Sequence, residues 1–410
     1  MTRRTSAVRG TRDPYGLGPA RDYIAPIVAG VALLVVAALT FSLMNNQVPF
    51  GIGKSGTGSN PGPNRTPAPP NVIIVEPEVT FPGSIVYAKA GNVWIQTGKD
   101  VRQLTDAGKD SMPSFSPDGQ WVYFIREQTG KGLYPLNHHG RLTWYDLSTP
   151  ELLRVPSDGN GKIEGIVNGR IKKGRSLGFF WIRQPVLSPN GHTIAVVSDG
   201  TDPGATDTVM QFYDTNTKKF TKLKLAESAT LGHQDPAWMA DGSYLLLVKN
   251  GRDGSRGAPQ IIKYNPENQK SFTITGPGYL SPAPSPDGKY IAATRTDSFG
   301  TDVVILDAAT GAEILRVTDD AGSFSPAWSP AGDAIAFLHL DGNIVDLQMA
   351  TLDGAPGSWT VAKTTSLTEV SGLDAASRPS WFVPPGELPA APSVAPSIAP
   401  ASSASASTAP

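Results

Sequence analysis

The residues best suited to molecular recognition are a basic stretch followed by aromatic side chains. The stretch consists of three cations and three rings: Lys172, Lys173, Arg175, Phe179, Phe180 and Trp181. Cations attract an anionic partner, and aromatic side chains often anchor protein interfaces. The segment therefore predicts a contact site for an acidic partner. The alternative is a solvated hairpin whose aromatic side chains pack against the rest of the protein and bind no partner.

Other polar candidates for partner binding are scattered along the chain: His138, His139, His233, Arg252, Arg295 and Arg378. His138 and His139 could hold a metal together with His233. Adjacent side chains on an extended chain point in different directions, however, so we expect no metal site. No cofactor is indicated.

Two motifs resemble ligand loops but lack the required context. Gly51–Gly56 has the spacing of a glycine-rich phosphate loop, yet no strand precedes it and no helix follows. Asp158–Glu164 begins like a calcium loop, but Lys162 and Gly169 occupy positions that need oxygen ligands. We expect solvated turns at both places.

Composition excludes several classes of function. The chain has no cysteine, so a thiol nucleophile, a disulfide or a cysteine metal site is impossible. Its net charge of −1 argues against bulk nucleic-acid binding. Because no catalytic motif is present, we predict that the protein is not an enzyme.

A repeated phrase defines the elements that must position these residues. Five copies occur: Pro113–Gly119, Pro185–Gly191, Pro236–Gly242, Pro282–Gly288 and Pro326–Gly332. Their final glycines are 72, 51, 46 and 44 residues apart. Repeats of this length built from short strands are typical of a β-propeller, in which each repeat is one blade.

Each copy ends in a Ser-Pro-Asp-Gly turn or a variant of it, followed by an apolar strand. The recurring acids Asp118, Asp241 and Asp287 are therefore expected to shape turns rather than an acid site. Two further strands follow in each repeat. In the first copy we expect them at residues 142–146 and 152–155.

The strand count predicts six blades closed by the two ends of the propeller. Arg378–Phe382 supplies one strand, and Ser84–Tyr87, Asn92–Ile95 and Asp100–Thr105 supply its partners. Joining them removes two exposed sheet edges. A seven-bladed alternative would need a hidden blade in the 72-residue interval.

The phrases Ser116–Gly119, Asp100–Thr105 and Arg316–Thr318 resemble the TolB-like (WD-type) propeller repeat, over about residues 82–385. The resemblance implies a periplasmic, protein-binding propeller of the cell envelope. In the TolB family a separate domain precedes the propeller, whereas here an apolar segment stands in that place.

Residues 23–44 carry no charge, and about 21 residues suffice to span a bilayer core of about 30 Å. Five arginines precede them, which predicts a cytoplasmic amino terminus and an extracytoplasmic propeller. We expect a cytoplasmic basic tail (1–22), a transmembrane signal-anchor helix (23–44), a flexible Gly/Pro-rich linker (45–80), the propeller (81–385) and a disordered Pro/Ala/Ser tail (386–410). A cleaved signal peptide is the alternative to the anchor.

Together these patterns predict an all-β, six-bladed propeller on one transmembrane helix in a bacterial-type cell membrane. We expect a monomeric, non-catalytic platform that binds an envelope protein or a cell-wall polymer and no nucleic acid. Its loops would lie on the face opposite the Ser-Pro-Asp-Gly turns. The alternative is an envelope hydrolase or lyase whose carboxylate, histidine and tyrosine side chains meet at the pore mouth.

Overall fold

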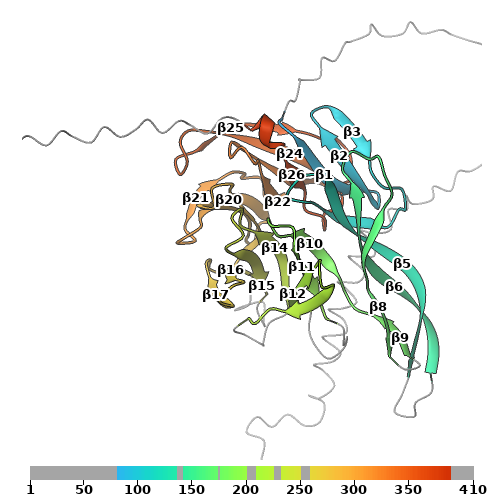
Figure 1. The fold of residues 1–410 in the computed structure, drawn as a ribbon. Helices are drawn as coiled ribbons and strands as arrows, with labels where there is room; N and C mark the ends of the chain where they lie inside the picture. The colour runs from blue at the N-terminus through green and yellow to red at the C-terminus, as the bar shows by residue number, and fades with distance from the viewer. Residues whose placement is uncertain are drawn as a thin grey trace, which may run out of the picture. The chain divides into compact units, whose positions relative to one another are not determined.

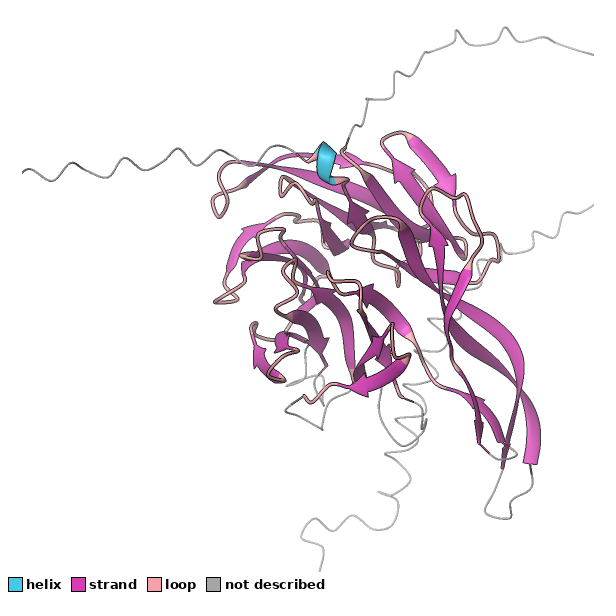
Figure 2. Ribbon diagram, viewed as in Figure 1, coloured by secondary structure: helices cyan, strands magenta, loops and turns pink. Residues whose placement is uncertain are grey.

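The computed structural model describes residues 81–135, 142–173, 176–200, 209–225, 232–250 and 259–388. The expected basic tail, transmembrane segment and linker (1–80) lie outside these ranges, as does the tail beyond residue 388. Among the residues described, no helix is long and apolar enough to cross a membrane. The regular structure is almost entirely β-strand, with one short 3-10 helix, Pro385–Glu387 (Figure 2).

Six antiparallel sheets form the six blades of a propeller (Figure 1). Blade 1 contains β26 (Ser380–Phe382), β1 (Ser84–Lys89), β2 (Asn92–Thr97) and β3 (Asp100–Gln103). Blade 2 contains β4 (Asp110–Phe115), β5 (Trp121–Pro135), β6 (Leu142–Pro156) and β7 (Glu164–Asn168). Blade 3 contains β10 (Arg183–Leu187), β11 (Thr193–Ser198), β12 (Val209–Asp214) and β13 (Lys219–Lys222).

Blade 4 contains β14 (His233–Trp238), β15 (Leu245–Lys249), β16 (Gln260–Asn265) and β17 (Lys270–Thr273). Blade 5 contains β18 (Tyr279–Pro284), β19 (Tyr290–Thr296), β20 (Thr301–Asp307) and β21 (Glu313–Arg316). Blade 6 contains β22 (Ser323–Trp328), β23 (Ala334–Asp341), β24 (Ile344–Asp353) and β25 (Thr360–Ser366). The first strand of each blade lies against the first strands of its two neighbours, so the ring is closed.

The Ser-Pro-Asp-Gly phrase forms the tight turn expected from the sequence. In blade 2, the Ser116 hydroxyl accepts from the amide of Trp121 at 2.9 Å and donates to Asp118 at 2.5 Å. Gly119 has φ +70°, a conformation that other residues rarely adopt. The carboxylate of Asp118 is thus used to hold the turn.

Two repeated phrases, Asp100–Thr105 and Arg316–Thr318, end in a threonine that stabilises the third strand of its blade. The Thr105 and Thr318 hydroxyls accept from the amides of Val93 and Val303 at 2.9 and 3.0 Å. Each bond satisfies a buried main-chain donor at the point where the fourth strand ends. The repeated phrase therefore has a structural reason.

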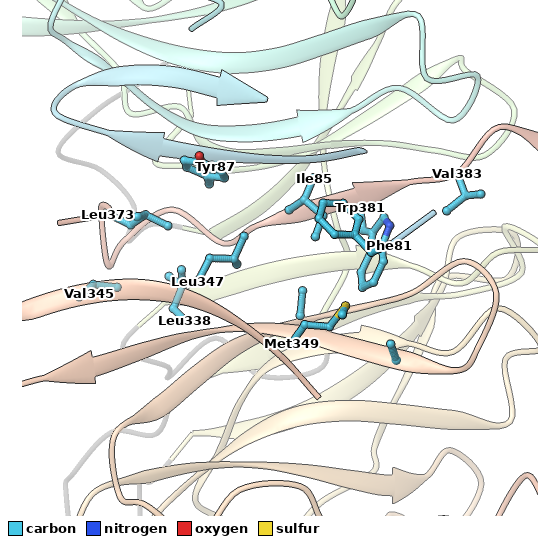
Figure 3. Packing of buried hydrophobic residues seen from close by; sticks show 12 residues of the cluster. Phe81, Ile85, Tyr87, Leu338, Val345, Leu347, Met349, Leu373, Trp381 and Val383 are labelled. Atoms are coloured by element: carbon cyan, nitrogen blue, oxygen red, sulfur yellow. The ribbon is translucent and has the colours of Figure 1, made fainter. Parts of the chain in front are cut away.

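The two ends of the propeller meet in blade 1, as predicted. Strand β26 pairs with β1, with Trp381 opposite Ile85. The Trp381 indole donates to the carbonyl of Pro82 at 2.9 Å and packs edge-on against Phe81. Figure 3 shows this cluster between blades 1 and 6, where Met349 also contributes.

Blade 2 corrects two of the sequence interpretations. Residues 142–146 and 152–155 are not separate strands but parts of the single strand β6, and β7 is the fourth strand. The Ser-Thr-Pro sequence at 148–150 resembles a turn, but β6 continues through it. A strand can contain proline at a position where the main-chain nitrogen does not have to donate a hydrogen bond. The 72-residue interval holds a long hairpin and two additional strands, β8 (Arg170–Lys173) and β9 (Ser176–Phe179), so the seven-bladed alternative is wrong.

Candidate binding face and central channel

The long hairpin of blade 2 extends well beyond the ring. Strands β5 and β6 pair without interruption from Trp121–Pro156 to Pro135–Leu142. Only the first part of this ladder belongs to the blade, because β4 pairs with β5 as far as Arg126. The outer part is joined by the β8–β9 hairpin through the pair Leu133–Leu177. We call the outer hairpin with β8 and β9 the arm (Figure 1).

One face of the arm carries apolar side chains, of which Trp144 is exposed and Leu133 and Leu177 are half-buried. Leu133 lies opposite Trp144 on β6 and opposite Leu177 on β9, so all three point to the same side. The Trp144 side chain is 59% exposed. Lys172 pairs with Leu177 and is also exposed. The arm therefore presents an exposed aromatic ring on β6 and an exposed lysine on β8, at the two edges of the same sheet.

The arm lies on the face expected for partner contacts. Consecutive strands of a blade are antiparallel, so the β5–β6 connection is at the opposite end from the Ser116–Gly119 turn. We call the end with the Ser-Pro-Asp-Gly turns the turn face and the other end the arm face.

The predicted aromatic trio divides between the arm and the core. Phe179 packs edge-on against Trp181 with ring centroids 5.3 Å apart, and Arg183 lies over the Trp181 ring. Phe180 is only 5% exposed and packs against Phe220. Phe180 follows the end of β9, and its ring belongs to the hydrophobic core between blades 2 and 3.

The Trp181 segment is also fixed through its backbone. Its amide donates to Asp199 Oδ1 at 2.6 Å. Burial raises the pKa of Asp199 above its ordinary value, although this amide bond opposes the shift. The base of the arm is therefore anchored to blade 3.

The other predicted residues that the structure describes divide between the arm and other blades. Lys173 ends β8, whereas Arg175, His138, His139 and Arg252 lie outside the described residues. Arg295, on β19 of blade 5, pairs with Glu313 at 3.4 Å. Lys173 thus belongs to the arm, and Arg295 belongs to blade 5.

His233 is an interior residue of blade 4. It is 5% exposed, lies opposite Lys249, and its Nδ1 has no hydrogen-bond partner. Burial, with smaller effects from Lys249 and Lys222, lowers its pKa from 6.5 to about 4. The imidazole is therefore neutral at pH 7. Within the described parts of the chain, no group of three or more potential ligands could hold a metal ion.

The residue before the first proline of each blade forms a ring around the central channel. Its members are Met112, Gln184, Asp235, Ser281, Ser325 and Arg378. The first five have φ between +47° and +55° and lie where the pairing of the first two strands shifts register. Such bulges re-aim side chains, here toward the neighbouring blade.

Hydrogen bonds run around this pre-proline ring from blade to blade. Asp235 donates its amide to Gln184 Oε1 at 2.8 Å and accepts from Gln184 Nε2 at 2.7 Å. Its other carboxylate oxygen accepts from the Ser281 amide and hydroxyl, both at 2.9 Å. The bonds compensate for the strained backbone, which otherwise costs about 1–3 kcal/mol per residue.

Arg378 crosses the channel. Its guanidinium donates to the carbonyls of Pro236 at 2.6 Å and Pro282 at 3.1 Å, which links blade 1 to blades 4 and 5. Burial lowers the pKa of Arg378, and the nearby Asp235 charge partly offsets this effect. An arginine predicted to contact a partner is thus engaged inside the ring.

The residues of the pre-proline ring can be compared with the carboxylate, histidine and tyrosine side chains that an active site at the pore mouth would need. Among the six ring residues the only carboxylate is Asp235, which is 6% exposed and accepts three hydrogen bonds from Gln184 and Ser281. The ring contains no histidine or tyrosine. Within this ring, the side chains of Gln184, Asp235 and Arg378 form hydrogen bonds that join different blades.

Comparison with known proteins supports the fold. No protein-family model matches the chain, and no curated protein matches it. The chain is similar to TolB from Acinetobacter baumannii, with 18% identity, TM-score 0.52, and coverage of 73% of this chain and 66% of that one. It is also similar to a structure described as putative TolB from Agrobacterium tumefaciens, with 15% identity, TM-score 0.52, and coverage of 75% and 95%. The nidogen/laminin complex matches with 12% identity, TM-score 0.49, and coverage of 73% and 98%.

The two TolB structures and the six sheets support a TolB-like six-bladed propeller fold. The alignment spans just under two thirds of the Acinetobacter protein, and identities below 20% say nothing about a shared ligand. Two residues important to the site, Leu133 and Trp144, were not selected as binding residues from the sequence. The repeated position before proline could have indicated that Asp235 belongs to the pre-proline ring.

Proposed function

We propose that this chain is a non-catalytic binding platform of the cell envelope, held to the membrane by residues 23–44 with the propeller on the extracytoplasmic side. It recognises an envelope protein or a cell-wall polymer through the arm face. The membrane segment and its orientation rest on the sequence alone.

The observation that carries this proposal is the arm. The outer part of the β5–β6 ladder extends a sheet beyond the ring, and this sheet carries exposed Trp144 on β6 and exposed Lys172 on β8. Tryptophan is enriched among the residues that contribute most to interface energies. The exposed lysine favours a partner with acidic groups near its apolar contact.

The state of the channel supports binding rather than catalysis. A general acid or base needs a titratable group within reach of a substrate, and Asp235 is enclosed by hydrogen bonds. Arg378 is held by two carbonyls. These groups rigidify the ring that carries the arm.

The proposal is tested by capture of partners from an envelope extract with the full chain and two arm variants, Trp144→Ser and Lys172→Glu. Matched controls are Phe272→Ser and Lys270→Glu, which change an exposed ring and an exposed lysine on β17 of blade 4. We expect each arm variant to weaken capture at least tenfold, because loss of one interface anchor costs about 2 kcal/mol or more.

The controls should retain the partner within about twofold. Equal capture by all four variants would contradict a role for the arm. If no partner is captured, and the wild-type chain instead hydrolyses or cleaves wall glycans or peptides, the platform proposal is wrong.

A further inference from the structure

A second feature lies on the turn face, away from the arm. A cavity of about 520 Å³ opens between blades 3 and 4. Side chains of Ser188, Asn190 and Thr193 line it from blade 3, together with Phe212; Trp238 and Asp241 line it from blade 4. Its volume is within the range of small-molecule sites.

The cavity exists because of two local size differences between blade junctions. At the junction of blades 5 and 6, Tyr290 and Trp359 pack together and against Trp328, which is 7% exposed. At the junction of blades 3 and 4, Thr193 takes the place of Tyr290 after the repeated turn. The β16–β17 turn (266–269) is shorter than the β24–β25 turn that supplies Trp359. Trp238, the counterpart of Trp328, is therefore left partly uncovered.

The apolar wall of the cavity is held in place before any ligand binds. Phe212 and Trp238 stack with centroids 5.4 Å apart and an interplanar angle of 22°. The Trp238 indole donates to the carbonyl of Val186 at 3.2 Å, which fixes the orientation of the ring. Little side-chain freedom remains to be lost on binding.

The polar rim offers both donors and acceptors. Asn190 Oδ1 accepts from the Ser188 hydroxyl and the His192 amide, which leaves the Asn190 amide group to donate. Asp241 Oδ1 accepts from the amide and hydroxyl of Ser243, which leaves Oδ2 as an acceptor. The Ser243 hydroxyl bond lowers the pKa of Asp241, so the group is ionised at neutral pH.

We propose that this cavity binds a single uncharged sugar ring. The C–H faces of a sugar fit an aromatic wall, and its hydroxyls both donate and accept, as the rim requires. An anion is disfavoured, because the lining residues include a carboxylate and no cation. An organic cation would satisfy Asp241 but leave the Asn190 amide without an acceptor.

The test is titration of the full chain with N-acetylglucosamine, followed by calorimetry or ligand-observed NMR in a buffer without sugar detergents. We expect saturable binding with a dissociation constant on the order of 1 mM, as for other ring-sized ligands. Thr193→Tyr, which copies the filled junction of blades 5 and 6, should abolish binding while leaving the melting temperature intact.

Asp241→Asn should weaken binding about tenfold, because the bond to a charged acceptor is lost. Asp287→Asn makes the same change in a turn outside the cavity and should alter affinity less than twofold. Absence of saturable binding by N-acetylglucosamine, glucose or galactose would overturn the proposal. So would unchanged binding to Thr193→Tyr, or tighter binding of choline than of sugar. The arm variants should bind sugar normally, so this result is independent of the proposed platform.

Discussion

Arg378 is expected to contribute more to stability than any surface arginine, because it joins three blades inside the channel. Replacing it with methionine keeps the aliphatic stem and leaves the carbonyls of Pro236 and Pro282 without their donor. A hydrogen bond involving a charged group contributes about 1.5–3 kcal/mol, so we expect a loss of about 3–5 kcal/mol. At about 2 °C per kcal/mol for a chain of this size, the melting temperature should fall by roughly 6–10 °C.

The assay is urea unfolding followed by tryptophan fluorescence, together with calorimetry. Arg295→Met is the matched control, because Arg295 is partly exposed and its contact to Glu313 is long. Its loss should cost at most about 1 kcal/mol. Arg378→Lys should be intermediate, since one ammonium cannot span both carbonyls. An Arg378→Met protein within 1 kcal/mol of wild type would refute the idea that this residue ties the ring together.

Two further predictions concern buried charge. The pKa of His233 is lower in the folded chain than in the unfolded chain, so the unfolded chain binds the proton at a higher pH. The free energy of unfolding should therefore fall by about 3 kcal/mol as the pH drops from 6.5 to about 4. In urea unfolding at a series of pH values, His233→Leu should remove this loss. The same change at exposed His192 should not remove it. An unchanged pH profile in His233→Leu would contradict the assignment of the loss to His233. Asp110 is fully buried and accepts two bonds from Arg126 at 2.6 and 2.7 Å, so Asp110→Asn should cost about 3–5 kcal/mol in the same assay. Asp146→Asn, which breaks an exposed pair with Lys131 on the arm, should leave stability nearly unchanged, and equal effects of the two substitutions would count against the burial argument.

The ring was predictable because its signals are local and repeated. Each Ser-Pro-Asp-Gly turn is held by contacts within a few residues, as at Ser116 and Asp118, so the sequence contains all that the turn needs. The closing strand at 380–382 followed from counting unpaired strands. Both inferences use short-range chemistry and the cost of an open sheet edge.

The arm and the channel could not be predicted in the same way. Whether a strand stops or continues at residue 146 depends on its partner strand, and β5 continues to Pro135. Phe180 and Trp181 are both aromatic, yet only pairing with neighbouring strands decides which one is buried. The contact between Arg378 and Pro236 spans 142 residues and carries no local signature.

The cavity between blades 3 and 4 illustrates a further limit. It arises because residue 193 is a threonine, whereas the equivalent residue at the junction of blades 5 and 6 is Tyr290. In addition, the β16–β17 turn has no counterpart of Trp359. Each difference is visible in the sequence, but its effect appears only when the blades are placed side by side. A comparison of equivalent positions across repeats could have found it.

The most direct test of the platform is removal of the outer β5–β6 hairpin, which carries Trp144, from an intact ring. Gln128 and Thr149 are opposite each other in the β5–β6 ladder, so an Asn-Gly turn can join them in place of residues 129–148. The pairs of β4 with β5 and of β6 with β7 that build blade 2 are retained. We predict that this shortened chain keeps a cooperative unfolding transition and fails to capture the envelope partner of the full chain. Capture at full strength by the folded, shortened chain would contradict the account.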